Sequence, residues 1–282
     1  MITSKQFNLT KHNNLRLNSI AKEFYIPESY NDLTTLIKLL NDRKQRFYIL
    51  SSGSNVLLKP FIKTPVIYLM ELDKTLSYNK ETNTVVAGCS VKIQTLINFL
   101  ADNNLGGIEY LYSLPASVGG CVCMNAGRGK DHNVCISDYL TSVEYLDGEV
   151  LNIIEKDKCE FSYRMSIFHN SKKIITKAFF QFPSQEKEIA KKTIKERLDY
   201  VKHYQEPKKP SLGSIFSNVD PRIMRRVKGL RVGNAAYSKK TLNWISNLGN
   251  VSYIQIVILI NIVKLISFFL NKKATLEVKK WT

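Results

Sequence analysis

The most glycine-rich part of the chain is the stretch 106–130, GGIEYLYSLPASVGGCVCMNAGRGK. It has no acidic residue after Glu109, and it combines Pro115 and Ser117 with the glycine pair Gly119-Gly120. Glycine reaches positive φ without a Cβ penalty and leaves neighbouring amide groups uncovered. Successive N–H groups that point into one concavity bind an anion such as a pyrophosphate without a cationic side chain. The stretch therefore predicts an anion-binding loop or, as the simpler alternative, two tight turns between strands.

Two further short segments repeat this chemistry. Residues 51–55, SSGSN, lie between the apolar runs FYIL (47–50) and VLL (56–58), and Asn125-Ala126-Gly127 closes the central stretch. Both segments offer small hydroxyl, amide or glycine residues next to strand-like runs. Two such loops at strand ends favour a dinucleotide cofactor over chance.

The charge balance is the least ordinary feature of the composition. The 282 residues are 44% hydrophobic and 23% charged, which is typical of a globular protein of two or three small domains. Lys and Arg number 41 against 24 Asp and Glu, a net charge of +17, which attracts nucleic acid, anionic membranes or anionic small molecules. The lysines are dispersed and no nucleic-acid-binding motif is present, so we expect a solvated lysine-rich surface and no nucleic-acid partner.

Cysteine and histidine give no metal or disulfide pattern. The five cysteines include no C-x-x-C pair, and the four histidines are scattered. This usage indicates a reducing compartment and no metal site. Cys121 and Cys123 alternate with Val122 and are expected to act as small core residues. The N-terminus lacks the apolar segment of a secretory signal, so we expect a cytoplasmic protein.

An 18-residue, mostly apolar run covers residues 253–270. Gln255, Asn261 and Lys264 interrupt it, so it lacks the continuous apolar character of a membrane span. Apolar residues recur at helical spacing at Ile256, Leu259, Ile260, Val263, Ile266 and Phe269. We therefore predict a buried amphipathic helix and no membrane partner.

The remaining periodicities predict a mixture of helices and strands. Helices are expected at 28–43, with Asp32 able to cap, at 92–103 and at 185–204. Strands are expected at 47–50, 66–70, 84–87, 142–146, 150–154, 173–182 and 275–280, with a hairpin turn at Asp147-Gly148-Glu149. This pattern predicts an α+β protein of three domains, 1–71, 72–184 and 185–282.

Four ordered motifs carry a family resemblance. The segments LSSGSNVLL (50–58), SLPASVGGCVCMNAG (113–127), CEFSYRMSIF (159–168) and SLGSIFSN (211–218) resemble, in the same order, those of UDP-N-acetylenolpyruvoylglucosamine reductase, also called UDP-N-acetylmuramate dehydrogenase. The resemblance spans about residues 13–281 and is closest to the compact form of the family. It implies a FAD-binding fold of the vanillyl-alcohol-oxidase type, with two flavin-binding subdomains at 1–71 and 72–184 and an α+β substrate domain at 185–282.

The resemblance implies a reaction and its residues. The family uses NADPH and a flavin to reduce the enol ether of UDP-N-acetylglucosamine enolpyruvate to UDP-N-acetylmuramate, in peptidoglycan precursor synthesis. Arg164 matches the cation that stabilises the enolate, Ser214 the proton donor and Glu277 the partner of the arginine. Tyr163 and Asn218 match substrate contacts. Positions that match the flavin contacts are Gly53, Ser54, Asn55, Ser117, Gly119, Gly120, Asn125 and Gly127.

Several positions depart from the family pattern. Ser51-Ser52 stands where the first loop usually has more glycine, and Tyr204-Gln205 stands where a lysine usually precedes the glutamine. The missing lysine affects the expected contact with the diphosphate of the substrate. Lys202, Lys208 or Lys209 are the substitutes available for that contact. Two alternatives follow: a divergent FAD-dependent oxidoreductase acting on another nucleotide sugar, or a catalytically impaired flavin-binding paralogue. A third alternative, from another class of protein, is a basic binding protein whose glycine loops are only turns. The sequence leaves the oligomeric state open.

Overall fold

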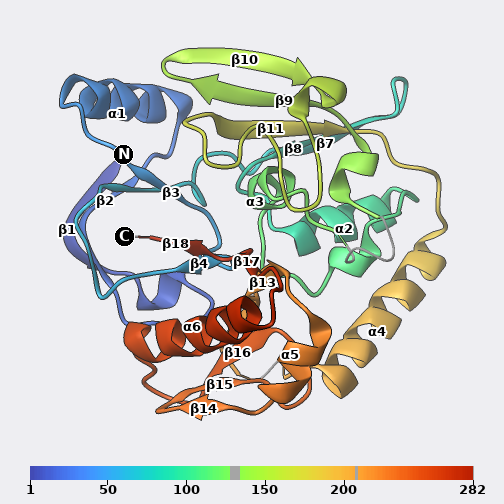
Figure 1. Cartoon of the computed structure of the whole chain (residues 1–282). Coiled ribbons are helices and arrows are strands. Elements are labelled where there is room, and N and C mark those ends of the chain that lie inside the picture. Colours follow the sequence, from blue (N-terminus) through green and yellow to red (C-terminus); the bar gives the residue numbers. More distant parts are fainter. Residues whose placement is uncertain (128–133, 207–208, 282) are drawn as a thin grey trace. The chain divides into compact units, whose positions relative to one another are not determined.

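The structure is a computed structural model that describes residues 1–127, 134–206 and 209–281 (Figure 1). Its residues form two units. Unit 1 comprises Met1–Ser4, Phe24–Ser52 and Thr64–Asp199, and unit 2 comprises Lys5–Glu23, Gly53–Lys63 and Tyr200–Thr282. Three elements contribute residues to both units: β1 (Ile2–Asn8), β2 (Ile20–Ile26) and α4 (Lys187–Tyr204).

Unit 1 is built on a five-stranded antiparallel sheet in the order β10-β9-β11-β8-β7 (Figure 1). The hairpin of β9 and β10 pairs Asp147 with Val150, as the Asp-Gly-Glu turn predicts. The strands are β7 (Leu76–Asn79), β8 (Thr84–Gly88), β9 (Leu140–Asp147), β10 (Val150–Glu155) and β11 (Ile174–Phe180). Short 3-10 helices lie at Glu109–Leu111, Ile136–Asp138 and Lys156–Cys159.

The first part of unit 1 is a parallel arrangement. β3 (Tyr48–Leu50) and the end of β2 both pair with β6 (Val66–Tyr68) in parallel. Helix α1 (Tyr30–Asp42) connects β2 to β3 and buries Leu33, Leu36, Ile37 and Leu40. Its N-cap is Ser29, whose hydroxyl accepts from the Asp32 amide, because Ser29 has the extended backbone that a cap requires. Asp32 is not the N-cap residue itself, but its carboxylate accepts from the Glu28 amide at 3.0 Å and so helps to cap the start of the helix, as expected.

A buried polar network connects α1 to the antiparallel sheet of unit 1. The Tyr30 hydroxyl donates to the Asp73 carboxylate, and the Lys177 ammonium lies 3.3 Å from Glu144. The Thr176 hydroxyl also donates to Glu144, at 2.9 Å. Burial, together with the Asp73 carboxylate, raises the pKa of the Tyr30 phenol, so this hydroxyl stays a donor at neutral pH. The network satisfies charges that would otherwise be costly to bury.

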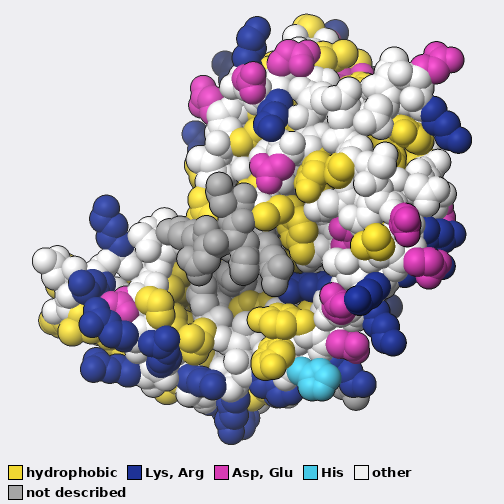
Figure 2. All heavy atoms as spheres, turned by 90° about the vertical axis from the view of Figure 1, so that its right-hand side faces the viewer, with side chains coloured by type: hydrophobic (Ala, Val, Ile, Leu, Met, Phe, Trp, Pro, Cys, Tyr) yellow, Lys and Arg dark blue, Asp and Glu magenta, His cyan; other side chains and the backbone are white. Residues whose placement is uncertain are grey.

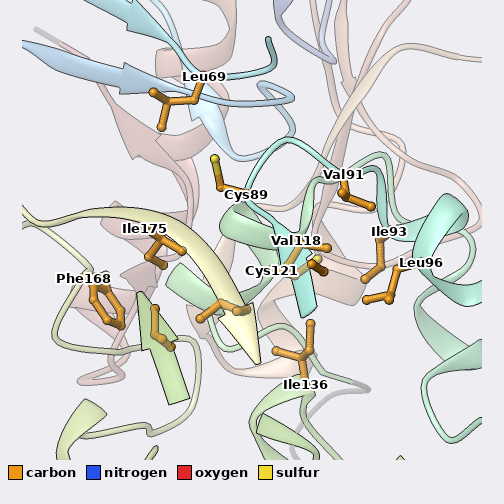
Figure 3. Packing of buried hydrophobic residues seen from close by; sticks show 14 of the residues in the cluster. Leu69, Cys89, Val91, Ile93, Leu96, Val118, Cys121, Ile136, Phe168 and Ile175 are labelled. Atoms are coloured by element: carbon orange, nitrogen blue, oxygen red, sulfur yellow. The ribbon is translucent and has the colours of Figure 1, made fainter. Parts of the chain in front are cut away.

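The core of unit 1 lies between its sheet and two helices, α2 (Ile93–Asp102) and α3 (Val118–Cys123). Figure 3 shows Val118 and Cys121 of α3 among Cys89, Val91 and Ile93. A Cβ on Gly119 would lie 2.9 Å from the Cβ of Cys89, so glycine lets α3 approach this closely. The glycine-rich stretch is thus partly helical, and Cys121 and Val122 are both buried. Cys121 is a core residue as expected, and Cys123 is half-buried against the same core.

Unit 2 contains an antiparallel sheet in the order β12-β16-β15-β14, against which α6 (Tyr253–Phe269) packs (Figure 1). Ser252 and Gln255 form a capping box that begins α6. Short pairs β13-β17 and β18-β4 complete the unit, with β5 beside the first residues of β2. The remaining helices are the 3-10 helix Thr10–His12 and α5 (Pro221–Arg226). The strands are β4 (Val56–Leu57), β5 (Phe61–Ile62), β12 (Ser211–Ser214), β13 (Phe216–Asn218), β14 (Arg231–Val232), β15 (Ala235–Tyr237), β16 (Trp244–Asn247), β17 (Thr275–Leu276) and β18 (Lys279–Lys280).

Two expectations for unit 2 need correction. The strand predicted at 275–280 is two short strands, because β17 pairs with β13 whereas β18 pairs with β4. Helix α6 buries Ile256, Leu259, Ile260 and Val263 as predicted, but Phe269 is 75% exposed. The α+β class is confirmed, because both units combine helices with antiparallel sheets.

Gly53 is the glycine whose replacement is expected to damage unit 2 most. Its φ is +67°, and an added Cβ would overlap the carbonyl oxygen of His12. Gly53→Ala therefore requires both a left-handed alanine and a backbone shift, which lowers the free energy of unfolding by roughly 3 kcal/mol. Gly148 provides the matched control, because its φ is +61° and no atom lies within 4 Å of the added Cβ.

Urea titration of the two FAD-free variants tests this expectation. Gly148→Ala has only the cost of an alanine in the left-handed backbone region and should lower the free energy of unfolding by about 1 kcal/mol. Equal losses in the two variants would mean that the contact between Gly53 and His12 is unimportant.

Candidate functional site

Ser117 organises the glycine segment of unit 1. Its side chain caps α3 by accepting from the Gly120 amide at 3.3 Å, and its oxygen lies 2.5 Å from that of Ser51. Gly120 has room beside these hydroxyls, because an added Cβ would find Ser117 Oγ at 3.6 Å and Ser51 Oγ at 3.9 Å. The three residues therefore form a small polar surface with one bare main-chain position.

The amides at the start of α3 are not bare. The Val118 amide donates to the Val91 carbonyl at 2.8 Å, and the Gly119 amide donates to the Cys89 carbonyl at 3.1 Å. Both bonds form because α3 packs against the turn that follows β8. The expectation of uncovered amides at Gly119 and Gly120 is therefore wrong in detail. The groups that face away from these bonds are hydroxyls and the Cα of Gly120.

Arg164 is joined to the end of the glycine segment. Its guanidinium donates to the carbonyls of Asn125 at 3.3 Å and Gly127 at 2.8 Å. Tyr163 lies beside it, with the guanidinium carbon 4.9 Å from the ring centroid. Asn125 in turn donates a hydrogen bond from Nδ2 to the Ser162 carbonyl at 3.1 Å. The segments 113–127 and 159–168, two of the four motifs, are thus one structural group within unit 1.

Asn125 Oδ1 leaves this group one unused acceptor. The atom is buried, and no donor for it is found in the part of the chain that the structure describes. Buried acceptors without a donor are rare and often mark the site of a bound group. Together with the hydroxyls of Ser51 and Ser117 and the open face of Gly120, this atom fits a polar, flat cofactor such as a flavin nucleotide.

Ser214, Asn218 and Glu277 come together in unit 2. The Glu277 amide donates to the carbonyl of Ile215 at 2.8 Å, directly after Ser214. The pairing of β13 with β17 places Asn218 opposite Thr275. Ser214 and Glu277 are half-buried, whereas Asn218 is exposed. Glu277 lies between β17 and β18, and its amide bond to Ile215 brings it next to the residue that follows Ser214 at the end of β12.

The loop Gly53-Ser54-Asn55 also belongs to this part of unit 2. Asn55 donates from Nδ2 to the Glu277 carbonyl at 3.3 Å and accepts at its own carbonyl from the Lys279 amide at 3.0 Å. The Gly53 carbonyl accepts from Asn14 at 2.9 Å. Among residues 1–127, 134–206 and 209–281, the amides of Gly53 and Ser54 find no acceptor. These two main-chain donors are without a protein acceptor there, although Gly53 itself is buried.

The predicted residues thus form two groups, each inside one unit. Unit 1 holds Ser117, Gly119, Gly120, Asn125, Gly127, Tyr163 and Arg164. Unit 2 holds Gly53, Ser54, Asn55, Ser214, Asn218 and Glu277. Sequence reasoning missed Ser51, whose hydroxyl contacts Ser117. Its signal was the SSGSN loop, in which the serine was interpreted only as a missing glycine.

A shallow basic depression near Asn218 was also missed. Its volume is about 620 Å³, and its lining includes Arg222, Arg225, Lys272 and Lys273. The Arg222 guanidinium holds the pKa of Asp220 down to about 2, so this acid is a carboxylate at any physiological pH. The depression collects cations from α5 and from the turn after α6, which no single stretch of sequence indicates.

The lysines considered for the diphosphate have separate environments. Lys209 lies 2.8 Å from the Glu206 carboxylate, so its charge is partly compensated. Lys202 is on the exposed side of α4, and Lys208 lies outside the described residues. Lys209 is therefore a weaker substitute than its place in the sequence suggests.

The cysteines near the glycine segment are chemically quiet. All five are free thiols among the residues described. Burial raises the pKa of Cys121 to about 12 although the Arg164 charge lowers it, and burial also raises the pKa of Cys89 to about 12. Both thiols are neutral at pH 7, which suits packing and excludes a resting thiolate.

The described residues contain neither a metal-binding cluster nor a membrane-spanning helix. No group of three or more His, Cys, Asp or Glu is arranged to hold a metal ion. No described helix combines the length and the apolar character needed to cross a bilayer.

Comparison with known proteins gives one consistent result. Residues 21–153 match the model of the FAD binding domain. UDP-N-acetylenolpyruvoylglucosamine reductase from Francisella tularensis is 32% identical, over 93% of each chain, and that from Halalkalibacterium halodurans is 31% identical, over 91% of this chain and 86% of the relative. The crystal structure of the reductase from Thermus caldophilus is similar with a TM-score of 0.79 and 25% identity, over 100% of this chain and 98% of the other. The chain belongs to the UDP-N-acetylenolpyruvoylglucosamine reductase family.

Proposed function

We propose that this protein reduces UDP-N-acetylglucosamine enolpyruvate to UDP-N-acetylmuramate, with FAD as cofactor and NADPH as electron source, in peptidoglycan precursor synthesis in the cytoplasm. The observation that carries the proposal is the likeness to reductases of that name over more than nine-tenths of this chain. The chain also matches 93% and 86% of the lengths of these two relatives.

Each group, within its own unit, offers residues that match the flavin contacts of the family. The hydroxyls of Ser117 and Ser51, the unused Asn125 oxygen and the open face of Gly120 are the available contacts in unit 1. The uncovered amides of Gly53 and Ser54 are anion donors in unit 2. When bound, the flavin supplies a hydride that it has received from NADPH.

The protein's own residues handle the charge and the proton. Hydride addition to the enolpyruvyl double bond leaves negative charge on the carbon beside the carboxylate. Arg164 stabilises that charge, because a guanidinium offers a planar donor fork to carboxylate or enolate oxygens. Ser214 then donates its hydroxyl proton to the carbon, and Glu277 assists Arg164 at the enolate. A serine hydroxyl is a weak acid and suits only a strongly basic carbon in a site without water.

An NADPH oxidation assay on FAD-loaded protein tests the proposal. Oxidation should require UDP-N-acetylglucosamine enolpyruvate, and the product should be two mass units heavier than the substrate. UDP-N-acetylglucosamine, which lacks the double bond, is the matched control and should give no oxidation. Protein that resists FAD loading would contradict the proposal. Oxidation with another nucleotide sugar alone would favour the divergent oxidoreductase.

A further inference from the structure

Helix α6 has apolar side chains on two opposite sides. Its inner side packs into the core of unit 2. Its outer side, here called the α6 outer face, presents the exposed polar residue Asn261 among five exposed apolar residues: Ile254 at 66%, Ile258 at 41%, Leu265 at 57%, Phe268 at 76% and Phe269 at 75% exposure. At 100° per residue these positions lie within about 100° of one another around the helix.

The α6 outer face is too apolar for a helix that meets only water. A surface helix of a globular protein normally has polar residues opposite its buried stripe. Here Phe268 and Phe269 stand in solvent with their rings in edge contact, 5.7 Å between centroids. Contiguous exposed apolar residues with a polar rim mark a surface that binds something.

The rim of the α6 outer face is cationic. The sequence of α6 contains no Asp or Glu, and Lys264 is exposed on it. Lys272 and Lys273 follow the helix, and they line the basic depression together with Arg225 of α5. The acid of that depression, Asp220, is paired with Arg222 at 2.8 Å. On the side of the molecule that Figure 2 presents, Lys and Arg side chains also lie beside exposed hydrophobic ones.

We propose that the α6 outer face and its cationic rim bind the surface of an anionic phospholipid bilayer. An apolar helix side with phenylalanines enters the boundary between headgroups and acyl chains, and the flanking lysines meet the lipid phosphates. The helix would lie in the plane of the surface, since it is too short to cross. This binding site is separate from the proposed reductase chemistry, and it departs from the expectation that the helix has no membrane partner.

Charge favours the bilayer over a second copy of the chain. Each copy of the chain carries a net charge of +17, so two copies repel one another. Anionic lipid offers the opposite charge and an apolar layer in one surface.

Vesicle flotation of the full-length, FAD-loaded protein tests this inference. The protein should float with vesicles of equal phosphatidylglycerol and phosphatidylcholine and not with phosphatidylcholine alone. Phe268→Ser/Phe269→Ser should abolish flotation while NADPH oxidation and Tm stay unchanged. Val150→Ser/Ile153→Ser is the matched control, because these β10 side chains are 62% and 63% exposed. That control variant should float like the wild type.

A charge variant and sedimentation velocity complete the test. Lys272→Gln/Lys273→Gln should lower the vesicle partition coefficient about 30-fold, at about 1 kcal/mol for each cation. Equal binding to neutral vesicles, or full binding by Phe268→Ser/Phe269→Ser, would overturn the inference. A dimer that the phenylalanine variant dissociates would also overturn it, because a second copy would then cover the face. None of these outcomes alters the NADPH oxidation assay, so the two proposals fail separately.

Discussion

Ser214→Ala should slow reduction of the enolpyruvyl substrate about 10²- to 10⁴-fold, while NADPH still reduces the bound FAD at the normal rate. The proposed role of Ser214 is to deliver one proton after hydride addition, and loss of a positioned general acid has this range of effect. Within the described residues the Ser214 hydroxyl makes no hydrogen bond to the protein. Alanine should therefore leave β12 and the stability of unit 2 intact.

Stopped-flow spectroscopy separates the two half-reactions of this variant. Bleaching of the flavin by NADPH reports the first, and recovery of the absorbance on adding substrate reports the second. Ser217→Ala is the matched control: this serine lies on the neighbouring strand β13, and its hydroxyl donates to the Thr275 carbonyl at 3.4 Å. The control should turn over within a few-fold of wild type. Wild-type recovery in Ser214→Ala would remove Ser214 from the mechanism.

Local sequence signals predicted most of the elements because they do not depend on distant partners. The β9–β10 hairpin follows from its turn residues and flanking apolar strands, and α2 follows from its periodic apolar face. Helix α3 could not be predicted in this way. Its six residues include two glycines, which disfavour a helix, and it forms because Ser117 caps it and Cys89 accepts from Gly119.

The outer half of α6 shows a second limit of periodicity. When apolar residues occupy every side of a helix, their spacing does not indicate which side faces the core. Phe269 has the helical spacing of the residues predicted to be buried, but it lies in the last turn of α6 and is exposed. The division into domains 1–71, 72–184 and 185–282 stays a prediction, as do the roles of the site residues.

The two site groups were found by resemblance and not by chemistry visible in one segment. Nothing near Glu277 in the sequence indicates that its amide bonds to the residue after Ser214. That neighbourhood depends on the pairing of β13 with β17, strands more than 50 residues apart by their numbering. The resemblance supplied the long-range information that periodicity and spacing lack.

Arg164→Lys should lower turnover of the FAD-saturated protein about 10²- to 10³-fold, the range for losing one preorganised donor to a developing negative charge. The guanidinium donates to the Asn125 and Gly127 carbonyls from two nitrogens. A lysine carries its three donors on a single nitrogen and lacks the planar fork that spans both carbonyls. We therefore also expect FAD to bind about tenfold more weakly, since Asn125 and Gly127 belong to the proposed flavin contacts.

Measuring turnover at saturating FAD separates these two effects of Arg164. Arg197→Lys is the control for a conservative change of an arginine in unit 1, because Arg197 donates from Nε to Ser113 at 2.9 Å, outside both site groups. It should retain turnover and FAD affinity. If saturating FAD restores full turnover to Arg164→Lys, Arg164 holds the Asn125–Gly127 segment and does not stabilise the enolate. If turnover stays low while NADPH still reduces the bound FAD, the loss lies in the step that generates negative charge on the substrate, which is where a guanidinium fork is required.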